Sequence, residues 1–212
     1  MNKSIFGALV LCLAASAAMA QTDSATYIMN DQIQAVLKSG TATDRTLRVL
    51  DMGSYQLSVA VIHRGATSPG AASQGTASAA AAARPPGAPT CGLSAPPAGA
   101  AAGQRGMISH SDTVETYIVT SGSGTLITGG QIVNGAPSVP DSDVTRILNG
   151  PSCSGQVYGP TVNRVVKAGD VIVIPANVAH GWTAIADHVT YLSVRPDSKK
   201  VLQSGYVHPA IK

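Results

Sequence analysis

Residues 110–124 and 169–180 read HSDTVETYIVTSGSG and GDVIVIPANVAH, and these two stretches decide the fold. Residues 116–120 and 171–174 are short runs of Thr, Tyr, Val and Ile, with glycine, serine or proline near their borders. Such β-branched runs between turn-forming residues are typical of strands. We therefore predict a strand in each stretch, the second of which ends at Pro175.

Similar short runs recur along the chain, which has 212 residues with 22 glycines and 13 prolines. Glycines at 121–124 and 129–130 predict turns, and the proline-containing stretch 134–161 predicts a loop-rich connection. Many short strands joined by glycine turns indicate an all-β fold, either a closed barrel or a sandwich. The other strands are expected at 46–51, 55–64, 125–128, 162–166, 181–186 and 189–194.

Residues 1–20 have the pattern of a secretory signal peptide. Lys3 supplies the positive charge, an apolar run follows, and Ala18-Met19-Ala20 is an A-x-A cleavage site. A transmembrane anchor is the alternative, but the apolar run is short for a span. We expect cleavage after Ala20 and a periplasmic or secreted mature protein.

Residues 21–65 are expected to contain one short helix, at 25–38, and the first strands. The apolar residues of 25–38 recur at helical spacing, Thr22 or Ser24 could cap the start, and Gly40 suits the end. We expect this helix to pack on the outside of a sheet.

Residues 66–106 consist mainly of Ala, Gly, Pro and Ser and have no hydrophobic period. Such a segment buries too little apolar area to offset its ordering entropy, so we predict a flexible, disordered insertion. Cys91 lies in it, and Cys153 is the other cysteine of the mature chain. An even pair in an exported protein predicts a disulfide, with two free buried thiols as the alternative.

The polar residues of the two opening stretches have a spacing that resembles the two motifs of the cupin superfamily. The first motif is written G-x5-H-x-H-x3,4-E-x6-G, and its second histidine, glutamate and last glycine correspond to His110, Glu115 and Gly122. The second motif is written G-x5-P-x-G-x2-H-x3-N, and it matches at Gly169, Pro175 and His180. The resemblance implies a cupin-type β-barrel, a double-stranded β-helix or jelly roll, with its core and C-terminal tail in residues 107–212.

Three residues depart from these motifs. Ile108 stands at the first histidine, Asn177 at the second motif's inner glycine and Ala184 at its final asparagine. Asparagine tolerates the positive φ of a turn, so Asn177 is a mild change. The family usually binds its metal with three histidines and one glutamate. Ile108 removes one of these histidines.

The resemblance leaves His110, Glu115 and His180 as the expected metal ligands. Two imidazoles and one carboxylate suit a divalent transition metal such as Fe, Mn, Zn or Ni, and they leave positions open to substrate, water or oxygen. The alternative is a metal-free barrel in which the three side chains hydrogen bond to one another. Unpaired ionisable groups inside an apolar barrel are costly, which favours the metal.

Strand periodicity adds neighbours to this site. Tyr117 shares a face with Glu115, and Trp182 shares one with His180, so we expect the tyrosine near the metal and the tryptophan in the pocket. Ile108 is expected to line the same substrate pocket.

His63 is a candidate acid–base group or extra ligand, because it ends a strand whose Val59 and Val61 are expected to face inward. The alternative is a surface histidine at a strand end. Arg164 and Arg195 could bind a substrate carboxylate, but we expect a surface role for each.

We predict a metal-dependent enzyme acting on a small organic molecule, of the dioxygenase, lyase or isomerase type, in which Tyr117 or His63 handles a proton. The alternative is a non-catalytic exported cupin that binds a small ligand or metal. The sequence has no basic stripe, which argues against nucleic acid, and no later membrane span. A homodimer is expected on family grounds.

Overall fold

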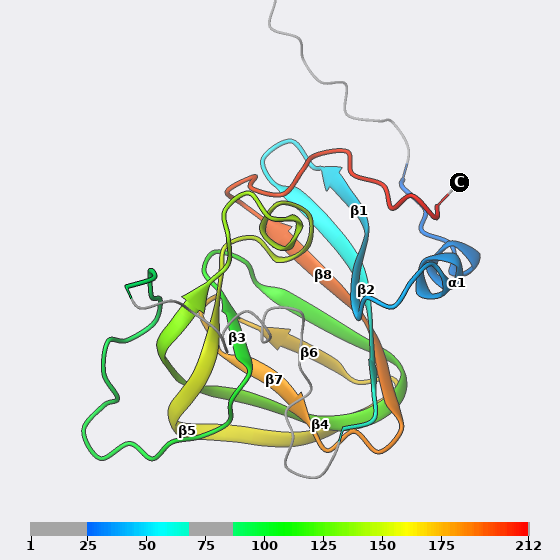
Figure 1. Cartoon of the computed structure of the whole chain (residues 1–212). Coiled ribbons are helices and arrows are strands. Elements are labelled where there is room, and N and C mark those ends of the chain that lie inside the picture. The colour runs from blue at the N-terminus through cyan, green and yellow to red at the C-terminus, as the bar shows by residue number, and fades with distance from the viewer. Residues whose placement is uncertain (1–24, 68–86, 212) are drawn as a thin grey trace, which may run out of the picture.

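Eight antiparallel strands form a barrel of two facing sheets in the computed structural model, which describes residues 25–67 and 87–211 (Figure 1). The predicted signal peptide and its cleavage site lie outside the described residues. The elements are α1 Asn30–Lys38, β1 Asp44–Asp51, β2 Gln56–Gly65, β3 Met107–His110, β4 Glu115–Pro137, the π-helical turn η1 Val144–Asn149, β5 Ser152–Lys167, β6 Val171–Ile174, β7 His180–Thr183 and β8 His188–Asp197. The all-β prediction with one short N-terminal helix is confirmed.

Strand β4 belongs to both sheets. Its residues 115–122 pair with β6 and β8, and its residues 123–137 pair with β5 and β7. The first sheet has the order β1-β2-β8-β4-β6, whereas in the second the strands β4, β5, β3 and β7 pair in a closed ring. The β3–β7 pairing places Ile108 opposite His180 and so brings the two motifs together.

The predicted turns at 121–124 and 129–130 are bends inside β4, so that prediction is wrong. The strand shifts register between Val119 and Ser121, and again between Gly129 and Gln131. Gly122 has φ 71°, and a Cβ there would lie 2.0 Å from the His188 carbonyl oxygen. Glycine therefore allows β4 to turn the corner between the sheets without ending.

The stretch 134–161 also differs from the predicted loop, because it contains the end of β4, the turn η1 and half of β5. Leu148 of η1 packs into the barrel core, so η1 closes one end of the barrel.

Two apolar clusters lie on opposite faces of the first sheet. Inside the barrel, Ala60 and Ile62 of β2 pack with residues of β4, β7 and β8. Outside, Val61 packs with Val36 of α1, and Val59 borders the same cluster. The expectation that Val59 and Val61 face inward is therefore wrong, because the other alternate set of β2 lines the barrel.

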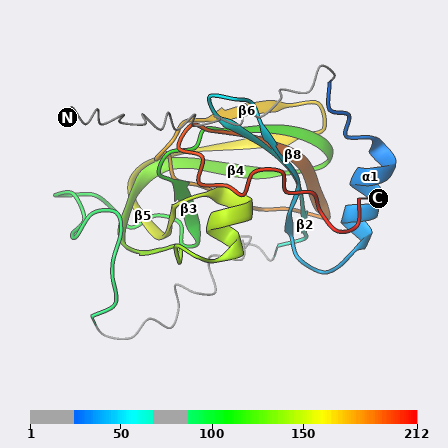
Figure 2. The same ribbon diagram turned by 90° about the horizontal axis from the view of Figure 1, so that it is seen from above.

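Helix α1 begins five residues later than predicted and ends where expected. The Met29 N–H donates to Gln32 Oε1 at 3.2 Å, which satisfies a backbone group at the start. At the end, Arg45 donates to the carbonyl oxygens of Val36 and Leu37 at 3.2 and 2.9 Å. Seen from above, α1 lies outside the barrel next to the C-terminus (Figure 2).

Residues 87–106 of the predicted flexible insertion run along the hairpin of β4 and β5, and the rest of it lies mainly outside the described residues. Cys91 and Gly135 exchange backbone hydrogen bonds of 3.0 and 2.9 Å, and Gly103 donates to Val157 at 2.8 Å. The predicted disulfide between Cys91 and Cys153 is present, with 5.8 Å between the Cα atoms. Backbone pairing and the crosslink thus fix this part, which composition alone could not indicate.

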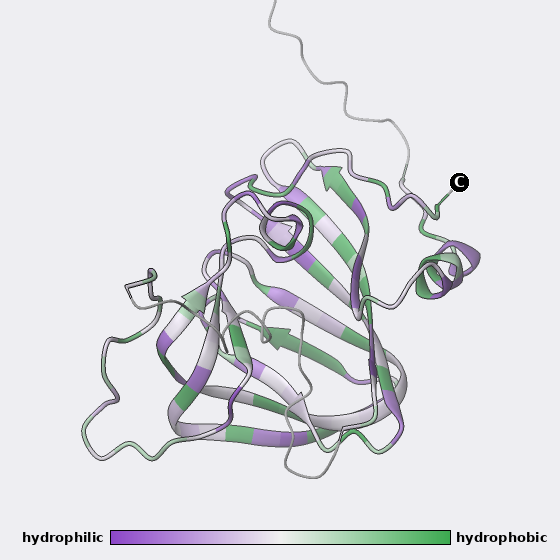
Figure 3. Ribbon diagram, viewed as in Figure 1, coloured by the Kyte–Doolittle hydropathy of each residue, from purple (hydrophilic) through white to green (hydrophobic). Residues whose placement is uncertain are grey.

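The two edges of the first sheet differ. The C-terminal segment covers β1, where Val49 exchanges hydrogen bonds with Gly205 and Tyr206. The other edge is β6, an apolar strand (Figure 3), whose Val171 and Val173 are 61% and 63% exposed. No helix within the described residues is long and apolar enough to cross a membrane.

Candidate metal centre

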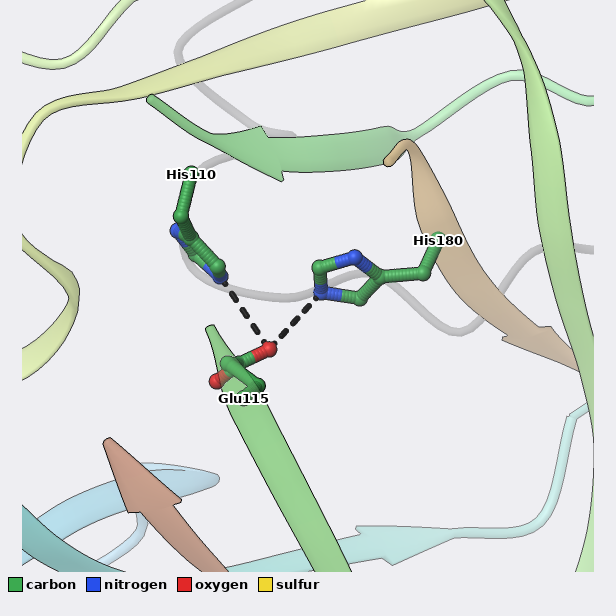
Figure 4. Close-up of side chains that lie close together, drawn as sticks. All are labelled: His110, Glu115 and His180. Atoms are coloured by element: carbon green, nitrogen blue, oxygen red, sulfur yellow. Dashed lines mark ion pairs between the residues drawn. The ribbon is translucent and has the colours of Figure 1, made fainter. Parts of the chain in front are cut away.

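His110, Glu115 and His180 meet inside the barrel, where β3 ends and β4 and β7 begin (Figure 4). Glu115 Oε2 lies 3.2 Å from His110 Nε2 and 3.0 Å from His180 Nε2. Asn177, at φ 63°, holds the second motif against the first, because its N–H donates to His110 O at 2.8 Å and its amide to Ser111 O at 3.0 Å. No fourth His, Cys, Asp or Glu of the described residues joins the group.

Hydrogen bonds orient both imidazoles with Nε2 toward the carboxylate. His180 Nδ1 lies 3.0 Å from Val178 O, which can only accept, so Nδ1 carries the proton. Ser152 donates its hydroxyl proton to Gly150 O and is therefore left to accept from His110 Nδ1 at 2.8 Å. In the neutral rings both Nε2 atoms thus present lone pairs to Glu115 Oε2. Partners of this kind orient metal-binding histidines.

The second oxygen of Glu115 is held by β8. Ser193 donates to Oε1 at 3.0 Å, and the Arg195 guanidinium pairs with the same atom. Arg195 is only 3% exposed and also donates to Leu148 O of η1 at 3.0 Å. The expected surface role of Arg195 is therefore wrong, although Arg164 is exposed as expected.

The charges of the site follow from burial and from these contacts. Burial opposes ionisation of Glu115, but Arg195 and His110 outweigh it and hold the pKa of the carboxyl well below its usual range. Burial lowers the pKa of His110, against the opposing effect of Glu115, and so favours its neutral form. Burial and the nearby carboxylate raise the pKa of Tyr117 well above its usual value, so its phenol keeps its proton.

Tyr117 and Trp182 both lie in the barrel interior. The Tyr117 hydroxyl donates to Glu115 Oε2 at 2.9 Å, and its ring centroid lies 6.4 Å from that of Trp182. Trp182 Nε1 donates to the Tyr191 hydroxyl at 3.1 Å, and the Tyr191 ring lies 4.3 Å from Tyr117. The three rings form an aromatic wall beside the carboxylate.

A buried ion pair continues from this wall. Arg64 Nε donates to the Tyr191 hydroxyl at 3.1 Å, and its guanidinium lies 3.1 Å from Asp44. Burial alone would lower the pKa of Arg64, but Asp44 and Tyr191 raise it, so the arginine stays charged.

The structure places His63 apart from the group. His63 is exposed on the outer face of β2, whereas its neighbours Ile62 and Arg64 are buried. Ile108, the missing ligand position, is half-buried beside His180 on the strand that carries His110.

Sequence reasoning missed Ser193 and Ser152, and it assigned Arg195 to the surface. The alternation of β8 contained a usable signal, because Tyr191, Ser193 and Arg195 occupy every second position and therefore share the inner face. Ser152 had no comparable signal, since it meets His110 only through the β3–β5 register.

The donor set fits a divalent transition metal. Three lone-pair atoms converge, and His180 Nε2 is buried without a hydrogen-bond partner among the described residues, although Glu115 Oε2 is close. A cation between these atoms would satisfy all three. Arg195 already neutralises the carboxylate, which lowers the attraction for a cation, but it contacts Oε1, so Oε2, which accepts from Tyr117, still faces both imidazoles.

A family comparison decides the classification of this barrel. The model of the cupin family, described as "Cupin", matches residues 66–205. The chain belongs to the cupin family. No curated protein matches it at a significant level.

Solved structures with a similar fold are distant from this cupin. A protein from Bacillus halodurans is 13% identical, with a TM-score of 0.41, over 88% of this chain and 91% of the other. A protein with a double-stranded β-helix domain from Klebsiella pneumoniae subsp. pneumoniae MGH 78578 is 12% identical, with a TM-score of 0.35, over 78% and 89%. A cupin protein from Bacteroides fragilis is 14% identical, with a TM-score of 0.29, over 71% and 72%.

Proposed function

We propose that this cupin is a metal-dependent enzyme that acts on a small organic molecule. The observation that carries the proposal is the convergence of His110 Nε2, His180 Nε2 and Glu115 Oε2 in a buried site. Acceptors behind both imidazoles keep Nδ1 protonated, so the atoms that face one another are those that would bind a cation.

The three ligands would bind a divalent transition metal, which supplies Lewis acidity toward a substrate oxygen or redox chemistry. Arg195 and Ser193 orient Glu115 from behind. Tyr117 donates to the atom of Glu115 that would bind the metal, and its raised pKa makes it a hydrogen-bond donor rather than a base. Dioxygenase, lyase and isomerase chemistry all remain within this proposal.

Metal analysis of the purified protein tests the site. We expect about one transition metal ion per chain in the wild type and loss of most of it in His110→Ala and His180→Ala. His208→Ala, a histidine outside the group, should keep the wild-type content. Wild-type protein that holds no metal after incubation with Fe²⁺, Mn²⁺, Zn²⁺ or Ni²⁺ would refute the proposal.

A non-catalytic binding protein is the second candidate, and the Arg195–Glu115 pair favours it. The pair neutralises the carboxylate without a metal, and Ile108 has replaced a ligand. Glu115→Gln separates the two functions. A metal enzyme should lose metal and turnover in this variant, whereas a binding protein should show no turnover in the wild type and keep its ligand affinity.

We also propose that the protein is exported and forms a homodimer. The signal-peptide pattern of residues 1–20 supports export, and the disulfide suits an oxidising compartment. Cell fractionation should recover a chain that begins at Gln21 outside the cytoplasm. A cytoplasmic chain that retains Met1 would contradict export.

A further inference from the structure

A cavity lies outside the barrel, between α1 and the outer face of the first sheet. It has a volume of about 470 Å³, within the range of small-molecule pockets. Its floor is formed by the outward-facing residues of β2, β4 and β8, on the opposite side of the sheet from Glu115. Its lining includes Ile33 and Leu37 of α1, His63, Thr120, His188 and Leu192.

The lining is divided by polarity. Ile33, Leu37 and Leu192 form an apolar wall, and the floor carries two imidazoles with hydroxyl groups around them. The His63 and His188 rings stack with 5.5 Å between their centroids. Of the residues that the structure describes, no Asp, Glu, Lys or Arg lines this cavity.

Most polar groups of the floor already have partners. His188 pairs with Asp187 through Nδ1 at 2.6 Å and with Ser121 through Nε2 at 3.1 Å. His63 Nδ1 lies 2.8 Å from Thr190 Oγ1, and Thr120 donates to Thr190 O at 3.1 Å. Within the described part of the chain, His63 Nε2 is the ring nitrogen of the floor without a partner, and the amides of Asn30 and Gln34 on α1 also line the cavity.

The surroundings of His63 favour an anion. Burial lowers the pKa of His63, and both His188 and Arg45 lower it further, with only Asp187 opposing them. The lowered pKa leaves the His63 imidazole uncharged at neutral pH, and Arg45 is the nearby cation that favours an anionic ligand.

We propose that this outer cavity binds a small monocarboxylic acid with an apolar body. The carboxylate would accept a hydrogen bond from His63 Nε2, and the apolar body would lie against Ile33, Leu37 and Leu192. This site is separate from the metal centre and does not depend on it.

Calorimetric titration with sodium benzoate, with benzyl alcohol as the uncharged probe, tests the proposal. We expect saturable 1:1 binding of benzoate, shifts of the His63 and His188 ring resonances in NMR spectra, and at least about tenfold weaker binding of the alcohol. His63→Ala should weaken benzoate by about tenfold or more, whereas His110→Ala should leave it unchanged. His63 is exposed, so its removal should not disturb folding.

A matched pair of variants isolates the charge. Ile33→Asp and Ile33→Asn have side chains of nearly equal size in the cavity wall, but only the first adds a negative charge. We expect Ile33→Asp to bind benzoate about tenfold more weakly than Ile33→Asn. The proposal would be overturned if benzoate shows no saturable binding or binds these two variants equally. It would also be overturned if His63→Ala binds benzoate like the wild type, or if His110→Ala loses the binding.

Discussion

Arg195 contacts the carboxylate that would also bind a metal, so two cations compete for Glu115. In Arg195→Met the buried carboxylate loses its counter-charge, which should destabilise the metal-free protein by about 3 kcal/mol. A divalent ion restores the missing charge, so Zn²⁺ should raise the free energy of unfolding more in Arg195→Met than in the wild type. Urea unfolding with EDTA and with Zn²⁺ measures both effects. Arg195→Lys, which keeps the charge, should respond like the wild type, and equal responses of all three proteins would argue against competition.

Ala184 stands where the cupin motif has asparagine, and it adopts φ 47° while exposed to solvent. An L-residue with a Cβ is strained in this region, whereas glycine is not. Ala184→Gly should therefore raise the free energy of unfolding by about 1 kcal/mol in urea titrations. Ala186, exposed and without a positive φ, is the control, and Ala186→Gly should lower stability. A destabilised Ala184→Gly would contradict the strain.

The sequence predicts the three ligand residues, but it does not predict Arg195, which contacts the ligand Glu115. His110, Glu115 and His180 stand at motif spacing, so sequence alone brings them together. Arg195 belongs to no motif, and arginine is usually exposed. Its burial depends on the tertiary pairing of two charges 80 positions apart, which only the fold brings together.

The segment 87–106 is held by the Cys91–Cys153 disulfide, which closes a loop with a sequence separation of 62. In the chain-entropy model, closing a loop of this length raises the free energy of the unfolded chain by about 4 kcal/mol. Cys91→Ala combined with Cys153→Ala should lower the free energy of unfolding by about 2–4 kcal/mol. Urea unfolding with and without dithiothreitol measures this difference. The reductant should lower the free energy of unfolding of the wild type and leave that of the double variant unchanged. An unchanged midpoint in the double variant would show that the backbone pairs of 87–106 suffice.

At the level of strands, local signals located elements but not their continuity. The sequence predicts a strand at 171–174 with the observed bounds of β6, because Gly169 and Pro175 mark both ends. The glycines at 122 and 129 predict turns, although β4 passes through both. A glycine with positive φ can occur in a turn or at a bend inside a strand. Strand β4 continues through both glycines because it pairs with β6 and β8 on one side of the corner and with β5 and β7 on the other.

Across the whole molecule, three histidines link stability to pH. Burial lowers the pKa of His63, His110 and His208 below the ordinary value of 6.5. As the pH falls, these histidines therefore take up protons in the unfolded chain before they do so in the folded protein. Their contribution to the free energy of unfolding is fully present above pH 6.5 and is lost as the pH drops through the folded pKa values. With EDTA present, the free energy of unfolding should fall between about pH 7 and pH 5. Replacing His63 and His208 by glutamine should flatten this slope, and a free energy that rises toward pH 5 would contradict the assignment.

The proposed homodimer has a natural surface in the open edge of the first sheet. The C-terminal segment already covers β1, whereas among residues 25–67 and 87–211 no strand pairs with the outer edge of β6. Val171 and Val173 are exposed there, and Ile118 of β4 is partly exposed beside them. An uncovered apolar edge favours pairing with another strand, and a second copy would present the same edge. We expect sedimentation velocity to show a dimer for the wild type and a folded monomer for Val173→Lys. Val139→Lys places the same charge at a 67% exposed valine outside β6 and should remain dimeric. A dimeric Val173→Lys, or a monomeric Val139→Lys, would move the interface away from β6.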